Sequence, residues 1–331
     1  MSLKEDINFS IWCDFIERDF IEGEFKELID DGIIHGATSN PAIFEQSIKN
    51  SPAYKQQLEI LQNNEAKKIY EDLALSDIKN AAKVLKPLHS KDSDDGFISI
   101  EVDPTLCDDL EATIQEGKRL YKNLASENVM IKIPATEAGY EAMKELSSQG
   151  ININATLIFS PSQAVKCALA LNEGMKKTNK DVKAVISIFV SRFDRMCDND
   201  LKSKGLEAGK LGIINAIKCY YEISKFKNKN IRTLFASTGV KGDDLEPSYY
   251  VDKLLIPNTI NTAPLNTIKA WVKDGVKEAP DMEYSEDDCD EYFIELKKNG
   301  VDLENVYTRL LEDGIDAFKV SFKEMLKIIK E

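Results

Sequence analysis

The feature that most constrains the fold is a regular alternation of short apolar runs with helical patterns along most of the chain. The apolar runs predict eight strands, near Ser10–Asp14, His35–Asn40, Phe97–Val102, Val129–Pro134, Ile151–Ile158, Val182–Ser191, Arg232–Ser237 and Leu254–Asn258. Helical patterns such as Leu106–Ser126 and Gly139–Gln149 separate them. Strands that alternate with helices form a parallel sheet, and eight such units indicate a (β/α)8 TIM barrel of the α/β class. Periodicity alone also fits a doubly wound open sheet.

Two stretches lie outside this alternation. Residues 47–87 form a helical insertion between the second and third strands, about as long as two helices. Residues 280–331 form a C-terminal helical tail, whose apolar residues at three- and four-residue spacing are Ile315, Phe318, Phe322, Met325 and Ile329. We expect a single domain over residues 1–331 with this tail packed on the barrel, since TIM barrels run from about 200 to beyond 400 residues.

Composition excludes several classes of function. The net charge of −14 argues against a nucleic-acid partner, whose phosphates require a basic surface. The chain has only two histidines, His35 and His89, and six cysteines without metal-clip spacing, so we expect no metal site and reduced, buried thiols. No apolar run approaches the roughly 20 residues that span a bilayer, and residues 1–10 do not resemble a secretion signal. We therefore expect a cytoplasmic protein without a membrane contact.

Polar side chains gather where the apolar runs end. Alternate residues of a barrel strand point inward, and catalytic groups come from the C-terminal ends of several strands. The residues at inward positions are Asp14, Thr38, Asn40, Ser99, Glu101, Asp103, Lys132, Asn152, Asn154, Thr156, Ser187, Phe189, Ser191, Ser237 and Asn258, with Arg192 just beyond the sixth strand.

Lys132 carries the strongest signal among these residues. It lies in the apolar run Val129–Pro134, where an ammonium group is poorly solvated. Such a setting favours the neutral amine, which is a nucleophile. The alternative is a lysine at a strand end that reaches solvent or pairs with a carboxylate. The run by itself leaves both interpretations open.

Three other polar residues have simple structural explanations when each is considered alone. Glu101 fits an ion pair, Asp14 fits a cap for the segment that follows it, and Asn40 before Pro41 fits a turn. The combination favours chemistry, because a packed core has no use for several inward polar groups unless they contact a ligand.

Five segments of this kind follow one another along the chain: Gly36–Phe44, Ile98–Val102, Val129–Pro134, Asn152–Phe159 and Ser187–Arg192. Together, and in this order, they resemble the transaldolase family. The similarity extends from the N-terminal region to the helical tail. Any one segment is a weak signal, whereas five in family order are a strong one.

The resemblance implies a reaction through a Schiff base, without a metal or an organic cofactor. Lys132 would attack the ketose carbonyl, and the resulting iminium would accept electrons when the adjacent carbon–carbon bond breaks. Asp14 would be the acid/base that takes a proton from the sugar hydroxyl and returns it on addition. Glu101, with Thr156 and a bound water, would move protons while the Schiff base forms and breaks.

The resemblance also implies the substrate-binding residues. Asn40, Asn154 and Ser187 would hold the hydroxyls of the retained dihydroxyacetone unit, and Phe189 belongs to the same set. Arg192 would bind the substrate phosphate, because the forked donors of a guanidinium suit phosphate oxygens.

Two segments depart from the better-known branch of the family. That branch has a second arginine after the seventh strand, where this chain has Ala236–Lys241, so Ser237 and Lys241 are the candidates to complete the phosphate site. The continuation Ile133–Thr136 resembles a longer, separate branch. These departures leave the chemistry intact and make a homodimer only a candidate assembly.

The sequence thus predicts an enzyme, a transaldolase acting on phosphorylated sugars. It would transfer dihydroxyacetone from sedoheptulose 7-phosphate to glyceraldehyde 3-phosphate, giving erythrose 4-phosphate and fructose 6-phosphate. One alternative is a Schiff-base aldolase on the same barrel that releases free dihydroxyacetone. Another is a non-catalytic sugar-phosphate-binding barrel, which we disfavour because Lys132 and Asp14 are both present.

Overall fold

The protein is described by a computed structural model of residues 3–242 and 244–330. Its centre is a closed barrel of eight parallel strands, hydrogen-bonded in chain order, and β8 pairs with β1 to complete the ring. The predicted (β/α)8 barrel is therefore confirmed, and the open sheet is excluded. The strands are β1 (Ser10–Cys13), β2 (Gly36–Thr38), β3 (Ile98–Glu101), β4 (Val129–Pro134), β5 (Asn152–Ile158), β6 (Ala184–Phe189), β7 (Ile231–Ala236) and β8 (Ile260–Ala263).

The eighth strand was predicted in the wrong place. The run Leu254–Asn258 precedes β8, and its leucines are buried in the core directly after α12 (Tyr249–Lys253). Asn258 then adopts a left-handed conformation with a φ of 60°, which turns the chain into the strand. Asn258 therefore lies at the N-terminal end of the barrel, away from the mouth. The strand itself is half polar and gives only a weak apolar signal.

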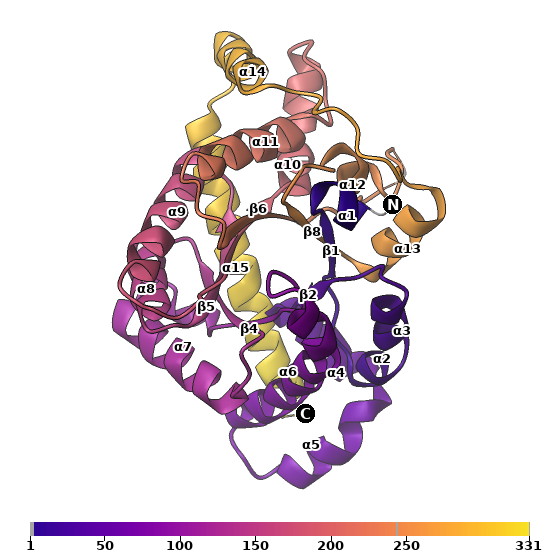
Figure 1. Ribbon diagram of the computed structural model, residues 1–331, viewed down its shortest axis with the longest axis vertical. Coiled ribbons are helices and arrows are strands. Elements are labelled where there is room, and N and C mark those ends of the chain that lie inside the picture. Colours follow the sequence, from indigo (N-terminus) through magenta and orange to yellow (C-terminus); the bar gives the residue numbers. More distant parts are fainter. Residues whose placement is uncertain (1–2, 243, 331) are drawn as a thin grey trace.

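Helices surround the barrel (Figure 1). Those that follow or flank the strands are α1 (Leu3–Ile7), α2 (Arg18–Glu22), α3 (Glu24–Asp30), α4 (Pro41–Asn50), α7 (Leu110–Leu124), α8 (Glu137–Ser148), α9 (Pro161–Met175), α10 (Ser191–Ser203), α11 (Leu211–Ser224) and α13 (Leu265–Asp274). Capping residues fix several of their starts: the Asp109, Thr136 and Ser160 side chains each accept a backbone N–H of the first turn. Within the described residues, no helix combines the length and apolar character needed to cross a membrane.

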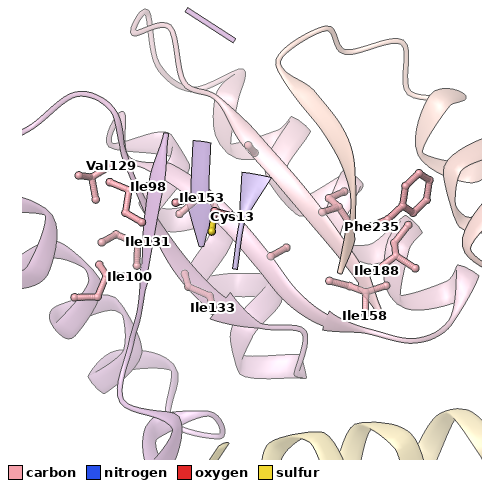
Figure 2. Packing of buried hydrophobic residues seen from close by; sticks show 14 of the residues in the cluster. Cys13, Ile98, Ile100, Val129, Ile131, Ile133, Ile153, Ile158, Ile188 and Phe235 are labelled. Carbon is pink, nitrogen blue, oxygen red and sulfur yellow. The ribbon is translucent and has the colours of Figure 1, made fainter. Parts of the chain in front are cut away.

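The main apolar core lies between the barrel and these helices. Successive strand residues face opposite sides, so every second residue packs outward under a helix. Figure 2 shows these outward residues, which are at most 2% exposed and include Ile98, Ile100, Val129, Ile131 and Ile133. The intervening residues of the same two strands, such as Ser99, Met130 and Lys132, face the barrel interior. Apolar packing outside thus fixes which side chains point inside.

The predicted insertion and tail are both helical. The insertion contains the end of α4, the short helix η1 (Pro52–Tyr54), α5 (Lys55–Leu61) and most of α6 (Ala66–Lys91). The tail contains α14 (Glu286–Lys298) and α15 (Leu303–Ile328). Four of the five predicted apolar tail residues are buried, and α15 contacts α4, β5, α10 and the short helix η2 (Pro104–Leu106). Since these elements lie at the C-terminal ends of strands, α15 crosses the mouth of the barrel (Figure 1).

An ionic cluster closes the opposite, N-terminal end of the barrel. The Arg232 guanidinium, which β7 directs inward, is 3.2 Å from Asp95 Oδ1 and donates to Ser10 Oγ at 3.1 Å. It also donates to the backbone carbonyls of Asn8 and Thr259, each at 3.0 Å. Asp95 Oδ2 in turn accepts from Ser10 Oγ at 3.0 Å. A buried charge is tolerated when it is paired and hydrogen-bonded in this way.

We predict that Asp95→Ala lowers the free energy of unfolding by about 3–5 kcal/mol, because it leaves the buried Arg232 without its carboxylate. The control is Asp94→Ala, since Asp94 forms an ion pair with Lys183 and its side chain is 36% exposed. That change should cost about 1 kcal/mol or less. Urea unfolding of both variants is the measurement, and equal losses would contradict a structural role for the Arg232–Asp95 pair.

Candidate active site

A cavity of about 350 Å³ opens at the C-terminal ends of the strands. Its walls contain nine of the eleven predicted site residues: Asp14, Asn40, Lys132, Thr156, Ser187, Phe189, Arg192, Ser237 and Lys241. The other two, Glu101 and Asn154, are buried directly behind the wall, beside Lys132 and Ser187 respectively. The barrel therefore gathers residues from seven different strand ends and loops around one space.

Lys132 lies at the bottom of this cavity and is only 5% exposed. Its Nζ donates to the backbone carbonyl of Ser39 at 3.1 Å and lies 3.7 Å from Glu101 Oε2. The ring of Phe318 covers it, with Nζ 5.8 Å from the ring centroid. The amine is thus held by one carbonyl and one carboxyl group and is covered by an aromatic ring.

Glu101 is the partner of Lys132 on the neighbouring strand, where β3 and β4 pair these two residues in register. Burial raises the pKa of Glu101 to about 7, and the nearby Lys132 partly opposes this rise. Within the described part of the chain, neither Glu101 oxygen has a hydrogen-bond partner, and Thr156 Oγ1 has none either. Unpartnered buried polar atoms are rare unless they serve a ligand or a bound water. Glu101 can therefore carry a proton to and from the space next to the lysine.

Asp14 follows β1 and faces the same cavity. Its Oδ1 accepts from Thr38 Oγ1 at 2.6 Å, and Thr38 Oγ1 is in turn 2.8 Å from Thr262 Oγ1. Two hydroxyls from β2 and β8 thus orient the carboxylate. Thr262 was missed in the sequence because the eighth strand was placed too early.

A chain of hydrogen bonds supports the opposite wall. Ser187 Oγ donates to Asn154 Oδ1 at 2.7 Å, and Asn154 Nδ2 donates to Ser99 Oγ at 3.1 Å. Asn40 caps α4, since its Oδ1 accepts from the Ile43 N–H at 3.0 Å. Asn40 also lines the cavity. These residues present amide and hydroxyl groups suited to sugar hydroxyls.

Arg192 provides the positive charge at the cavity mouth. Its guanidinium stacks on Phe189, with Cζ 4.9 Å from the ring centroid. Burial lowers its pKa to about 10, with Arg195 adding to the decrease and Asp313 opposing it. Among the described residues it forms no ion pair, so its charge is available to an anionic ligand. Ser191 and Ser237, whose hydroxyls lie 3.1 Å apart, and the exposed Lys241 border the same region.

Two further polar residues that the sequence placed at inward positions lie outside this cavity. Asp103 begins η2 and forms an ion pair with Lys67 at 2.7 Å, so its carboxylate is engaged outside the cavity. Asn152 lies at the N-terminal side of β5 and donates to the backbone carbonyl of Glu127 at 2.8 Å. The sequence also missed the role of Phe318, whose helical spacing indicated burial but not what it would cover. No group of His, Cys, Asp and Glu among residues 3–242 and 244–330 is arranged to hold a metal ion.

Comparisons with known proteins agree over nearly the whole chain. The family model for transaldolase/fructose-6-phosphate aldolase matches residues 11–329. A Helicobacter pylori protein named transaldolase is 47% identical over 322 residues, which cover 96% of this chain and 98% of the relative. A Campylobacter jejuni protein with the same name is 48% identical over 335 residues, covering 97% and 99% of the two chains.

We predict that the Glu101 carboxyl loses its proton near pH 7, well above the ordinary value of 4.5. The infrared C=O stretch of a protonated carboxyl should disappear with this midpoint in the wild type and be absent in Glu101→Gln. Subtracting the two spectra removes the other carboxyls. Since the folded protein holds this proton more tightly than the unfolded chain, Glu101 should make stability fall as pH rises between about 4.5 and 7. A midpoint near 4.5 would show that burial does not raise the pKa of Glu101.

Proposed function

The chain belongs to the transaldolase/fructose-6-phosphate aldolase family, and from this premise we propose how its residues carry out the reaction. It is an enzyme of the transferase class with transaldolase activity, and it acts on phosphorylated sugars. The reaction moves dihydroxyacetone from sedoheptulose 7-phosphate to glyceraldehyde 3-phosphate. The observation that carries the proposal is the buried Lys132 beside Glu101 at the bottom of a polar cavity.

Lys132 is the nucleophile in this proposal. Its neutral amine adds to the ketose carbonyl, and loss of water from the adduct gives an iminium ion. Glu101 supplies the proton that leaves with the water and takes one up when the Schiff base is hydrolysed. The carboxyl suits both tasks because its pKa of about 7 makes both protonation states accessible near neutral pH. Thr156, whose hydroxyl has no partner in the described part of the protein, orients the water.

Asp14 controls cleavage and re-formation of the carbon–carbon bond. It takes the proton from the sugar hydroxyl as that oxygen becomes the carbonyl of the departing aldehyde. The electrons of the broken bond move toward the iminium and leave an enamine on Lys132. When the acceptor aldehyde adds, electrons flow back and Asp14 returns the proton to the new hydroxyl. Thr38 keeps the carboxylate aimed at the cavity throughout.

The remaining residues hold the substrate. Asn40 and Ser187 bind hydroxyls of the retained three-carbon unit, and Asn154 fixes Ser187 from behind. Arg192 binds the phosphate at the mouth, assisted by Ser237 and Lys241. The phosphate-bearing aldehyde then leaves while the three-carbon unit stays covalently bound to Lys132.

We predict that borohydride traps a three-carbon adduct on Lys132 when the enzyme is incubated with fructose 6-phosphate. Lys132→Ala should yield no adduct and no turnover, because no other buried amine faces the cavity in the described residues. Peptide mass mapping locates the adduct, and the other lysines of the wild type serve as internal controls. Turnover by a folded Lys132→Ala variant would refute the Schiff-base mechanism.

We predict that Arg192→Ala raises KM for fructose 6-phosphate by about 10- to 100-fold, the loss expected for a charge-assisted hydrogen bond. The matched control is Arg195→Ala, because Arg195 is exposed on the same helix and does not line the cavity. Activity with unphosphorylated fructose should change little in either variant. Equal KM values for Arg192→Ala and the wild type would exclude Arg192 as the phosphate site.

A further inference from the structure

The segment that follows Asp14, residues 15–18, is fastened to the helical insertion rather than to the barrel. Ser47 Oγ on α4 donates to the backbone carbonyl of Ile16 at 2.7 Å. Ser51 Oγ donates to Glu17 Oε1 at 2.5 Å. Arg18 contacts both η1 and α6. Residues 16–18 are thus held by groups at least 31 positions further along the chain, between residues 47 and 77.

The centre of this attachment is an ion pair between Arg18 and Asp77. Arg18 Nε and Nη2 donate to Asp77 Oδ1 at 3.0 and 2.9 Å, and Nη1 donates to the Ala53 carbonyl at 3.3 Å. Tyr54 OH donates to Asp77 Oδ2 at 2.8 Å, and the Arg18 guanidinium stacks on the Tyr54 ring at 4.7 Å. Asp77 and Tyr54 are fully buried. Both carboxylate oxygens are engaged, so the arrangement has a single well-defined geometry.

Contacts from both the barrel and the helical insertion therefore hold the chain around Asp14. From the barrel, its backbone N–H donates to the Ala263 carbonyl at 2.8 Å and Thr38 Oγ1 donates to its carboxylate. From the insertion, the contacts begin two residues later at Ile16. A shift of residues 15–18 would reach Asp14 through a single intervening residue, and a misplacement of about 1 Å is enough to slow an acid/base step strongly.

We propose that Arg18, Tyr54, Asp77 and Ser47 are positioning residues that set the place of Asp14 for carbon–carbon bond cleavage. The insertion then has a role in the reaction although none of these four side chains lines the cavity. This proposal rests on the function assigned to Asp14 above. It assigns nothing to Lys132 or Glu101, which belong to other strands and to the step that forms the Schiff base.

The chain offers a matched control on the same helix. Glu71, also on α6 and buried, receives two hydrogen bonds from Arg119 on α7 at 2.8 and 2.6 Å. Glu71→Gln and Asp77→Asn each remove one carboxylate charge from an α6–arginine pair. Only the Asp77 pair holds the segment next to Asp14. A general loosening of α6 should therefore affect both variants. Loss of the correct position of Asp14 should occur only in Asp77→Asn.

The experiment is borohydride trapping with fructose 6-phosphate, quenched at times shorter than one turnover and analysed by mass. An uncleaved Schiff base gives a six-carbon adduct on Lys132, whereas cleavage gives a three-carbon adduct. In Asp77→Asn we expect the summed yield of the two adducts and the KM to stay within about twofold of the wild-type values, since binding and Schiff-base formation do not use Asp14. Conversion of the six-carbon to the three-carbon adduct, and kcat with it, should fall by about 10- to 100-fold. Glu71→Gln should resemble the wild type.

Ser47→Ala is the second variant, and it removes only the hydroxyl that holds Ile16, so it keeps the test valid where Asp77→Asn does not fold. It should slow cleavage in the same selective way, by a smaller factor. Equal adduct conversion in Ser47→Ala, Asp77→Asn and the wild type, or a parallel loss of trapping and cleavage, would overturn the positioning role. Absence of any adduct in the wild type would instead refute the proposed function, so the two failures are distinguishable.

Discussion

The site depends on a buried lysine that lines the cavity and on a glutamate buried beside it, behind the cavity wall. Lys132 is 5% and Glu101 6% exposed, and Nζ and Oε2 lie 3.7 Å apart. Burial raises the pKa of Glu101 to about 7 while the lysine opposes the rise, so both protonation states of this carboxyl are accessible near neutral pH. This balance requires β3 and β4 to pair Glu101 with Lys132 in register. A slip of one residue would turn one of the two side chains toward the helices.

The two ends of the barrel differ in whether their buried polar groups have partners. At the N-terminal end, the Arg232 guanidinium is surrounded by Asp95, Ser10 and backbone carbonyls, and its donors are satisfied by the protein itself. At the mouth, the Glu101 oxygens and Thr156 Oγ1 have no hydrogen-bond partner in the described residues. A fully satisfied network rigidifies a core, whereas an incomplete one is costly unless a ligand completes it. The same kinds of residues thus form a satisfied network at one end and leave unpartnered polar atoms beside the cavity at the other.

The sequence predicted the barrel and most of the site because each depends on local patterns. Seven strands have apolar runs, and alternation within them placed Lys132, Glu101 and Asn154 on the inner side. The eighth strand has only four residues, two of them polar, and the apolar run before it was mistaken for it. Its inward Thr262 was lost with it. Phe318 and the contacts of Arg18 with Asp77 join segments far apart in the chain, and no periodicity reports such contacts.

The helices added to the barrel, α6 and α15, contact the loops at the strand ends, whose positions strand pairing does not fix. Strand pairing fixes residues within the sheet, but catalytic groups at strand ends pass into loops, which are the more mobile part of such folds. Helix α6 contacts two of these loops. Its Asp77 binds Arg18 in the loop after β1, and its Lys67 binds Asp103 in the loop after β3. Asp77 and Lys67 are ten residues apart, about 15 Å along the helix, so one element contacts the segments that follow both Asp14 and Glu101. Helix α15 covers the third catalytic candidate, Lys132, with the ring of Phe318. The barrel supplies the chemical groups, and the added helices restrict how far they can move relative to one another.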